Sequence, residues 1–485
     1  MVEVSRRAFL MAGAAPAAPR VEQSLAEPIR GVEDGRQLLV DNWLVARLRG
    51  ATRRLNPPAP REVALTFDAP WEGPQSGYVT VLQDGACYRM YYRGGGDQTR
   101  EVTCMAESAD GVRWRRPSFG MFEHDGSKRN NIVWVGRTKG YAESHNMTPF
   151  IDANPATPPA ARYKALALGR QTDPATGDRR RTLVAMGSPD GLRWRRLREE
   201  PIITEGSFDS HNTAFWDTGL RRYVCYLRIG RSGVRSFARA TSPDFLHWTE
   251  PVPIETGHAP VEQFYTNAVV RYARAPGLYL AFPMRFVPER HAVGPNGEDL
   301  GPLSDGILMS SRDGVRFDRT FLEAYLRPGP NAANWGSGHS NNTMAWGLLA
   351  TAPGELSMYW TENAVAAPRL RRGTVVVDRL ASVAGPYQGG EMLTPPLAFR
   401  GGALEVNAAT SAVGSVRVEV RSAAGGPLPG FAMADCQPIY GDETERRVAW
   451  RPGASLARVA GGPVRLRFEL RDADLYALRF VQAAA

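Results

Sequence analysis

Short runs in which apolar and polar residues alternate recur along the chain, and turn-forming residues separate them. Such alternation places one set of side chains in a core and the other in solvent, which is typical of strands in antiparallel sheets. Five of these runs are rich in aromatic and β-branched residues, and each is the second arm of an expected hairpin. They are 88–93, 162–166, 222–228, 278–282 and 356–360. The pattern predicts an all-β protein.

A seven-residue turn pattern follows four of these arms. It begins with Ser, has Asp at its third position and ends on an aromatic residue, and it occurs at 108–114, 188–194, 242–248 and 311–317. Asp-Gly supplies the positive φ angles of a tight turn, while Ser and Asp accept hydrogen bonds from the turn N–H groups. A recurring unit of this kind indicates a repeat architecture. Five arms therefore predict a five-bladed β-propeller.

The chain divides into three predicted parts. Residues 1–20 carry the pair Arg6 and Arg7 before an apolar, Ala-rich stretch, which predicts a twin-arginine-type signal peptide and a periplasmic or secreted protein. Residues 31–395 form the propeller with an N-terminal segment that wraps it or supplies its closing strand. After Pro395 and Pro396, short alternating runs with Gly- and Pro-rich links predict an accessory β-sandwich at 397–485.

The composition is that of an ordinary soluble globular protein, with 43% hydrophobic and 22% charged residues. The net charge is +9, but the basic residues are mainly scattered arginines, so no nucleic-acid partner is expected. The four cysteines show neither CxxC nor metal-ligand spacing, so no disulfide framework, metal or cofactor is expected. No later stretch approaches the about 18 apolar residues that span a bilayer, so no membrane contact is expected after signal removal.

Each arm follows a strand that begins with polar residues. In a four-stranded blade the first strand lies innermost, so these polar starts should meet at one mouth of the central channel. Three starts carry an Asn, and the residue three positions upstream is Glu, Asp or His. A fourth start has a Glu five residues before its Asn, and the first is preceded by Trp-Glu. The carboxylates expected at this mouth are Glu72, Glu143, Asp209 and Glu262.

Two carboxyl groups in different environments are what glycoside hydrolysis requires, one protonated and one ionised. Crowded like charges raise one another's pKa, which provides the protonated member. Glu262 is followed by the less polar 263–265, so it is the favoured general acid, and Asp209 is the favoured ionised partner. Glu143 and Glu72 are the other catalytic candidates. For each carboxylate, capping of a turn is the structural alternative.

Other side chains at the same starts are expected to bind the carbohydrate through hydrogen bonds, and the histidines among them are interpreted as substrate contacts rather than metal ligands. They are His145, Asn146, His211, Asn212, Tyr265, Asn267, Arg285, His339 and Asn342.

A family resemblance follows from these motifs. From about Leu38 to Gly390 the chain resembles the furanosidase propellers of glycoside hydrolase families 32 and 43, and in particular bacterial proteins with a family 32 N-terminal-like domain. The resemblance rests on the five arms, Trp71-Glu72, 208–212, 262–267 and the trailing sandwich. It implies an acid, a nucleophile or base, and a third carboxylate that tunes them. The Asn-Asp-Pro, Arg-Asp-Pro and Glu-Cys motifs are not found, so individual roles do not transfer and fructan activity is not indicated.

Three hypotheses about function stay open on the sequence. The first is a glycoside hydrolase that acts on a poly- or oligosaccharide at the propeller mouth. The second is a phosphorolytic relative, which a clamp of arginines for phosphate at the mouth would support. The third is a propeller that binds carbohydrate without catalysis. The sequence gives no indication of the sugar, of the oligomeric state or of what the sandwich contributes.

Overall fold

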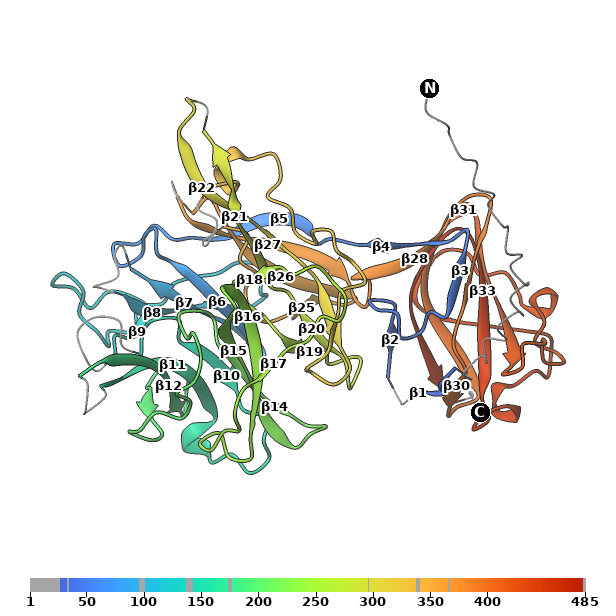
Figure 1. The fold of residues 1–485 in the computed structure, drawn as a ribbon, viewed down its shortest axis with the longest axis horizontal. Helices are drawn as coiled ribbons and strands as arrows, with labels where there is room; N and C mark the ends of the chain where they lie inside the picture. The colour runs from blue at the N-terminus through green and yellow to red at the C-terminus, as the bar shows by residue number, and fades with distance from the viewer. Residues whose placement is uncertain are drawn as a thin grey trace, which may run out of the picture.

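The computed structural model describes residues 27–32, 35–95, 101–136, 143–172, 177–294, 296–336, 341–364 and 367–482, so the predicted signal peptide lies outside the described residues. Strands account for most of the regular structure (Figure 1). In the described ranges the helical segments are four 3-10 turns, η1 (Pro159–Ala161), η2 (Ala332–Asn334), η3 (Met433–Asp435) and η4 (Leu456–Arg458). The all-β fold class predicted from the alternation is confirmed.

Five four-stranded antiparallel sheets form the larger body, the propeller, seen at the left of Figure 1. Each predicted arm is the second strand of its sheet, and the fifth sheet takes its last strand from the N-terminal side of the chain, which closes the ring. The sheets are β6 (Gly77–Asp84), β7 (Cys87–Gly94), β8 (Val102–Ser108), β9 (Ile132–Trp134); β10 (Thr148–Ile151), β11 (Tyr163–Thr172), β12 (Arg179–Ser188), β13 (Arg195–Arg196); β14 (Thr213–Asp217), β15 (Arg222–Arg231), β16 (Val234–Ser242), β17 (Val252–Pro253); β19 (Val270–Arg271), β20 (Tyr279–Ala281), β23 (Met309–Ser311), β24 (Phe317–Asp318); and β25 (Leu349–Ala352), β26 (Glu355–Glu362), β27 (Arg369–Val376), β5 (Ala59–Thr66).

The innermost segments of the sheets contact one another around the axis. The Thr80 hydroxyl on β6 lies 3.1 Å from Nε2 of His211, which directly precedes β14. The indole of Trp346 donates to the Val269 carbonyl at 2.7 Å, and the Trp346 backbone pairs with β6. These side chains are buried. The centre of the propeller is therefore filled by side chains over this part of its length, and ligand access is left to the loops at its ends.

The repeated turns are built as predicted, with one instructive exception. The Ser hydroxyl and the Asp carboxylate accept from the turn N–H groups in each, and Gly191 and Gly314 adopt φ of +76° and +74°. A Tyr hydroxyl from the preceding blade caps each of these glycine carbonyls, and an added Cβ would lie under 3 Å from that hydroxyl. In the third blade Phe245 takes the glycine position at φ +72°, and Leu166 replaces the tyrosine that would clash with it.

The aromatic residue that ends each turn packs beneath its blade. Trp194 is buried, with 6% of its surface exposed, and its indole donates to the carbonyl of Gly191. Trp114 and Trp248 are partly buried against the cores of the first and third sheets. These aromatic residues therefore add to the cores between the blade sheets.

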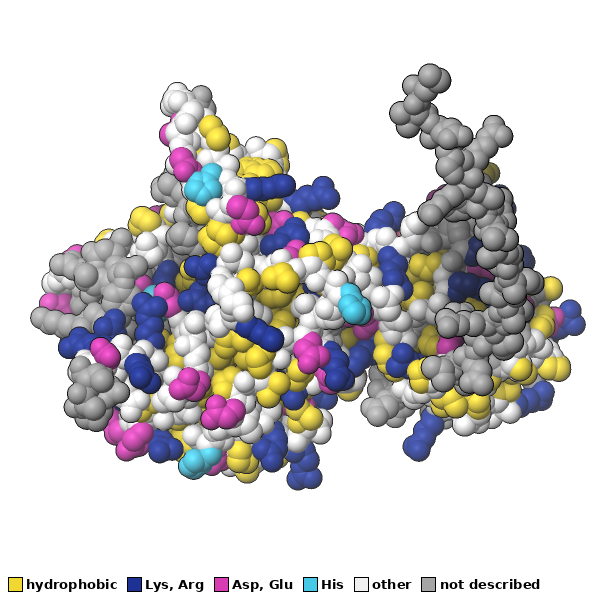
Figure 2. Space-filling model, in the orientation of Figure 1, with side chains coloured by type: hydrophobic (Ala, Val, Ile, Leu, Met, Phe, Trp, Pro, Cys, Tyr) yellow, Lys and Arg dark blue, Asp and Glu magenta, His cyan; other side chains and the backbone are white. Residues whose placement is uncertain are grey.

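A separate three-stranded sheet interrupts the fourth blade. It contains β18 (Gln263–Phe264), which precedes β19, and the strands β21 (Met284–Val293) and β22 (Asp299–Gly306), which are inserted between β20 and β23. The β21–β22 hairpin projects from the propeller in Figures 1 and 2, and its base carries the cross-strand pair of Arg285 and Asp305.

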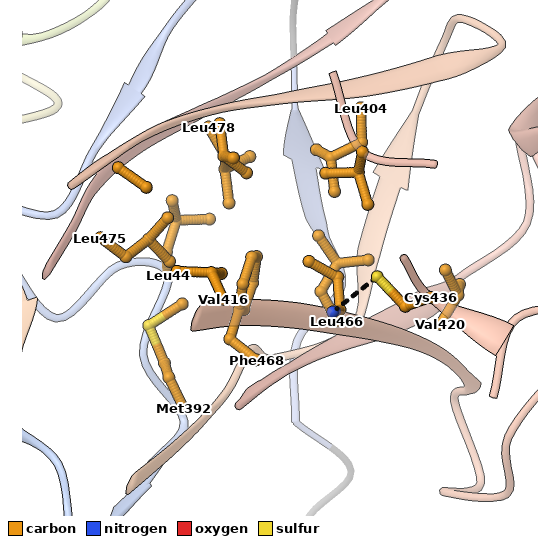
Figure 3. Packing of buried hydrophobic residues seen from close by; sticks show 14 of the residues in the cluster. Leu44, Met392, Leu404, Val416, Val420, Cys436, Leu466, Phe468, Leu475 and Leu478 are labelled. Atoms are coloured by element: carbon orange, nitrogen blue, oxygen red, sulfur yellow. Dashed lines mark hydrogen bonds between the residues drawn. The ribbon is translucent and has the colours of Figure 1, made fainter. Parts of the chain in front are cut away.

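The smaller body at the right of Figure 1 is the sandwich domain, a ten-stranded assembly. The long β31 and β33 pair with each other and fold over one apolar core, where Val416 of β31 and Phe468 of β33 meet Met392 and Leu44 (Figure 3). Its strands are β1 (Arg30–Val32), β2 (Gln37–Leu38), β3 (Arg47–Arg49), β4 (Thr52–Leu55), β28 (Ala381–Gly385), β29 (Gly390–Leu393), β30 (Leu397–Phe399), β31 (Ala403–Ser422), β32 (Asp442–Arg447) and β33 (Val464–Val481).

The sandwich domain begins earlier than the expected boundary at 397. Strands β2 to β4, β28 and β29 lie within the range assigned to the propeller, yet they pair with one another and with β33, and β1 pairs with β30. The physical reason is that the edges of β33 offer unpaired backbone groups, which these short strands satisfy. Strands β4 and β28 then run side by side between the two bodies in Figure 1, so the domains are joined by a paired ribbon.

Candidate functional site

Asp209 lies on a braced loop immediately before β14. Phe208 is buried beneath it, and the Ser210 hydroxyl donates to the Tyr265 carbonyl at 2.8 Å. The Asn212 side-chain amide donates to the carbonyls of Phe208 and Ser210 at 2.8 and 3.1 Å. These contacts hold the loop on both sides, while 34% of the Asp209 side chain stays exposed. Asp209 is thus a fixed carboxylate that a ligand can reach.

His145 joins Asp209 to a second carboxylate. Its Nε2 lies 2.8 Å from Oδ1 of Asp209, and its Nδ1 lies 2.5 Å from Oε2 of Glu101. Glu101 and His145 are buried. The two ring nitrogens of His145 thus each face a carboxylate oxygen. The hydrogen bond from His145 is the main reason that the pKa of Asp209 lies well below its usual value, and the charges of Arg181 and Arg228 lower it further, although burial opposes them. Asp209 is therefore ionised at neutral pH.

Two Tyr–Arg pairs flank this group. The guanidinium of Arg93 lies 4.7 Å from the ring centroid of Tyr78, and that of Arg228 lies 5.0 Å from the ring centroid of Tyr265. Both arginines occupy the end of the second strand of a blade, and each Nε donates to the carbonyl of an upstream loop residue. The mouth is consequently lined by aromatic faces and guanidinium groups around one exposed carboxylate.

An open cavity of about 1050 Å³ lies at the base of the β21–β22 hairpin. Its wall includes Glu262, Arg285 and Asp305, together with the exposed indole of Trp335. Arg285 bridges the two carboxylates: its Nη1 lies 2.7 Å from Oε1 of Glu262, and its Nε and Nη2 lie 2.8 and 2.6 Å from the two oxygens of Asp305. An aromatic platform beside polar groups is suited to a sugar ring, which presents apolar faces and hydroxyl edges.

The pKa of Asp305 shifts in the opposite direction to that of Asp209. Burial raises its pKa above the usual value, and the charge of Glu262 adds to the rise, although hydrogen bonds from Arg285 oppose it. Because 20% of the side chain is exposed, it can meet a ligand. The sequence analysis missed Asp305, since it belongs to an inserted hairpin and follows no repeat. The available signal was an Asp at the end of a β-run, directly before Gly306.

Glu262, the favoured general acid, has a setting that does not suit this role. Its Oε1 is bound by Arg285 and its Oε2 lies 2.6 Å from Nη2 of the buried Arg319. Both carboxylate oxygens of Glu262 are therefore engaged by guanidinium groups. The aromatic neighbours that suggested a less polar pocket do not outweigh these charges, because Phe264 points into the core instead.

Glu72 and Glu143 are held away from solvent by structural ion pairs, and this corrects their assignment as catalytic residues. Both side chains are 0% exposed. Glu72 pairs with Arg116 at 2.9 Å and accepts from the Tyr92 hydroxyl at 2.5 Å. Glu143 pairs at 2.5 Å with Arg196, which lies on the outermost strand of its blade. A carboxylate without exposed surface cannot reach a substrate, so both brace the propeller.

The asparagines expected to bind substrate mostly hold the backbone. Asn267 donates to the carbonyls of His211 and Tyr226, and Asn342 donates to those of Ser304 and Asn334. Asn146 accepts from Arg93 at 3.0 Å, and its amide nitrogen has no hydrogen-bond partner among the described residues. Asn212, as shown above, braces the Asp209 loop. These four residues position the inner strands.

The histidines expected at the mouth differ in their settings. His145 contacts Asp209, whereas His211 is 0% exposed and sits against Thr80 and the ring of Tyr78. Burial lowers the pKa of His211 to about 3, so its ring is neutral at physiological pH. His339 lies outside the described residues.

Tyr265 connects the Asp209 group with the cavity. Its ring packs on Phe286, a cavity residue, at 5.6 Å between centroids. Arg235 lies against both rings and donates to the Gln263 side chain at 2.9 Å. Tyr265 and Phe286 therefore form an aromatic contact between the loop that carries Asp209 and the cavity whose wall includes Asp305. Whether Asp209 and Glu262 fall within glycosidase spacing of each other stays a prediction.

Two further properties concern the described part of the chain. No group of three or more His, Cys, Asp or Glu side chains there is arranged to hold a metal ion. No helix within those ranges is long and apolar enough to cross a membrane. On the face shown in Figure 2, Lys and Arg side chains are dispersed over both bodies and do not gather into one basic patch.

Comparison with known proteins gives similarity at the level of structure. No protein-family model matches the sequence, and no curated protein matches it. A solved structure described as a glycoside hydrolase is 12% identical, covers 66% of this chain and 92% of its own, and has a TM-score of 0.45. An N-acetylgalactosamine deacetylase from F. plautii is 13% identical over 68% of this chain and 96% of its own, with a TM-score of 0.44.

A family 32 β-fructofuranosidase from Bombyx mori is 8% identical, covers 88% of this chain and 94% of its own, and has a TM-score of 0.41. At these identities the likeness concerns the fold, so the function is argued from the residues of the site.

Proposed function

We propose that the protein is a glycoside hydrolase that acts on a poly- or oligosaccharide, with Asp209 as the ionised carboxylate and Asp305 as the proton donor. The observation that carries the proposal is the contrast between these two exposed carboxyl groups. One is held below its usual pKa by His145, and the other is raised above it by burial. Such a pair, with environments that push the pKa values apart, is what acid–base cleavage of a glycosidic bond needs.

The residues around the two carboxyl groups support the assignment. A saccharide seated on Trp335 and Phe286 would place its glycosidic bond towards Tyr265, between Asp305 and Asp209. Asp305 then gives its proton to the leaving oxygen as the C1–O bond breaks. Asp209 attacks C1 or takes a proton from the attacking water, and the spacing of the two carboxyl groups decides which. His145 and Glu101 keep Asp209 oriented and charged.

Leaving-group dependence tests both roles at once. Asp305→Asn keeps the shape of the side chain but cannot donate a proton, so hydrolysis of alkyl glycosides should fall about 10²–10⁴-fold while dinitrophenyl glycosides stay near wild-type rates. Asp209→Asn should lose activity towards both kinds of glycoside alike, because the role of Asp209 does not depend on the leaving group. The measurement is kcat/KM over a panel of aryl and alkyl glycosides of different sugars.

Asp299→Asn on the same hairpin is the matched control, because its carboxylate contacts the exposed His291 away from the cavity. It should leave both substrates unaffected. Equal loss of alkyl and aryl glycosides in Asp305→Asn would remove Asp305 as the acid. Saccharide binding without turnover of any member of the panel would favour the non-catalytic hypothesis.

We also propose that residues 1–20 direct export through the twin-arginine pair. The support is the sequence pattern of Arg6 and Arg7 before a short apolar stretch. Replacing both by Lys should retain the protein in the cytoplasm of an expressing bacterium. Fractionation followed by immunoblotting measures this, and export at the wild-type level in the double variant would contradict it.

A further inference from the structure

Arg228 carries a buried donor that nothing in the described structure uses. The residue is 9% exposed, its Nε donates to the Ser207 carbonyl at 3.0 Å, and its Nη1 has no hydrogen-bond partner among the described residues. The charge of Arg228 helps to lower the pKa of Asp209. Among the described residues, however, no carboxylate forms an ion pair with the Arg228 guanidinium. Buried polar groups are nearly always satisfied, so an orphaned one calls for a ligand, a water or an ion.

Arg235 is a second arginine beside Tyr265 that has no acidic partner among the described residues. Its guanidinium lies 5.6 Å from the ring centroid of Tyr265 and 5.3 Å from that of Phe286. Its hydrogen bond goes to the neutral amide of Gln263, and within the described ranges it has no acidic partner. Two guanidinium groups without counter-charges therefore flank Tyr265.

Three other arginines near Asp209 and the cavity have acidic partners, unlike Arg228 and Arg235. Arg181 pairs with Asp209 at 3.0 Å, and Arg285 is bound by both Glu262 and Asp305. Arg93 lies 3.5 Å from Glu101. Because burying an unpaired cation is costly, an excess of two guanidinium groups at one place favours an anion brought by the ligand.

We propose that Arg228 and Arg235 form an oxyanion-binding subsite beside Tyr265, next to the acid–base pair. This proposal rests on the proposed function for its setting and adds the chemical class of the ligand. The guanidinium fork matches the paired oxygens of a carboxylate or a phosphate, and hydrogen bonds between charged groups are stronger than neutral ones. Arg228 contributes the preformed, buried donor, and Arg235 contributes a more accessible one.

Two sources supply such an oxyanion at a saccharide site. The first is the carboxylate of a uronic-acid residue, which would make the substrate an acidic saccharide. The second is free inorganic phosphate, whose oxygen would attack C1 in place of water. In that case the C1–O bond to the leaving sugar breaks, a C1–O–P bond forms, and the acid's proton goes to the leaving oxygen. The shared chemistry is the oxyanion, and the experiment separates the sources.

The test is direct binding to the purified full chain by calorimetry, with three probes. Tri-galacturonate carries the carboxylates, its methyl ester keeps the shape without the charge, and inorganic phosphate is the free anion. We expect tri-galacturonate or phosphate to bind, and Arg228→Gln and Arg235→Gln each to weaken that binding about 10- to 100-fold. Arg193→Gln, whose side chain is 79% exposed at a blade turn, is the control and should bind as wild type.

The arms of the experiment distinguish the sources and the possible failures. Acid binding above ester binding identifies a substrate carboxylate, whereas phosphate binding with release of a sugar 1-phosphate identifies the co-substrate. The inference is overturned if neither anion binds, if the ester binds as well as the acid and phosphate does not bind, or if both variants keep wild-type affinity. If Arg228→Gln does not fold, Arg235→Gln and the loss of wild-type affinity with rising salt decide the question.

Failure of this inference differs from failure of the proposed function. Arginine-dependent anion binding without hydrolysis of any glycoside would keep the subsite and remove the hydrolase. Rapid hydrolysis of neutral glycosides with no anion binding would keep the hydrolase and remove the subsite.

Discussion

Asp209 and Glu143 occupy the same place in successive blades, but their side chains differ in exposure and in partners. Each stands three residues before the asparagine of an inner strand. The Glu143 side chain has no exposed surface and pairs with Arg196, whereas Asp209 keeps 34% of its side chain exposed and binds His145 and Arg181. One carboxylate stabilises its own blade, and the other is presented at the mouth.

The difference arises from which strand supplies the arginine. Arg196 lies on β13, the outermost strand of the same blade as Glu143, so the ion pair turns the carboxylate away from the axis. Arg181 lies on β12 of the blade before Asp209, so its contact, like that of His145, spans two blades. Equivalent positions in a repeat have similar backbone conformations, but the neighbouring side chains determine where the carboxylate points.

Replacing Asp209 should have the largest effect on activity. In Asp209→Asn the amide keeps the shape but removes the charge that acts on C1 or on water, so kcat should fall by about 10²–10⁴-fold or more. The half-exposed loop is braced by Ser210 and Asn212, so the melting temperature should change little. Steady-state kinetics and thermal unfolding measure the two quantities. Activity within about threefold of wild type would show that Asp209, like Glu143, is not a catalytic residue.

Replacing Glu143 should act on stability instead. In Glu143→Ala the buried pair with Arg196 is broken, and the free energy of unfolding should fall by about 3 kcal/mol, the low end for such pairs because 19% of the Arg196 side chain is exposed. Glu199→Ala is the control, since Glu199 is mostly exposed and lies 3.7 Å from the same arginine. It should cost about 0–1 kcal/mol.

Denaturant titration measures these changes, and activity per folded molecule should stay at the wild-type level in both variants. A Glu143→Ala protein of normal stability that lacks activity would reverse the assignment and return Glu143 to the site.

Much of the fold follows from local patterns, because hairpin arms and Ser-x-Asp turns act within a few residues. The third blade shows how far this reaches: Phe245 breaks the glycine rule, and only the pairing of its blade with Leu166 explains why the turn still forms. The early start of the sandwich domain depends on pairing with β33, far along the chain. Such long-range pairing leaves no local mark in the sequence.

The site was predictable in part for the same reason. Asp209, His145 and Tyr265 were identified because they begin inner strands, which the repeat locates. Asp305 and Arg235 were missed because one belongs to an insertion and the other lies on a third strand, where the repeat predicts an ordinary surface. The electrostatic setting of Glu262 depends on Arg319, 57 residues away in the chain, and no sequence pattern announces that contact.

Acidification should remove the stability that the buried, neutral His211 contributes. The pKa of His211 is lowered to about 3 by burial, so the unfolded chain binds a proton below pH 6.5 and the folded chain does not until about pH 3. Stability from this group is therefore present above pH 6.5 and is lost as the pH falls. Between pH 7 and pH 5 the loss is about 2 kcal/mol.

Unfolding of wild type and of His211→Asn at several pH values measures this loss. The variant should be less stable at pH 7, but its stability should depend less on pH by about the same 2 kcal/mol. Parallel pH profiles of the two proteins would show that His211 is not buried as described.

The smallest expected effect belongs to Glu101, which acts on Asp209 only through His145. Glu101→Gln keeps the side-chain shape but removes the negative charge that faces Nδ1 of His145, so the hydrogen bond between Nε2 of His145 and Asp209 should weaken. Because the hydrogen bond from His145 is the main cause of the low pKa of Asp209, that pKa should rise towards its usual value of about 3.9. We expect kcat to fall by about tenfold, the lower part of the range for a side chain that acts through another, with KM nearly unchanged. The acid limb of the kcat–pH profile should also move to higher pH, since a carboxylate with a higher pKa is protonated sooner as the pH falls.

Glu107→Gln, on the first sheet where Glu107 pairs with the exposed Arg115, is the control and should leave both kcat and the acid limb in place. If Glu101 had only a structural role, Glu101→Gln would lower the melting temperature without moving the acid limb. In that case exposure alone, and not the contact through His145, would distinguish Asp209 from Glu143.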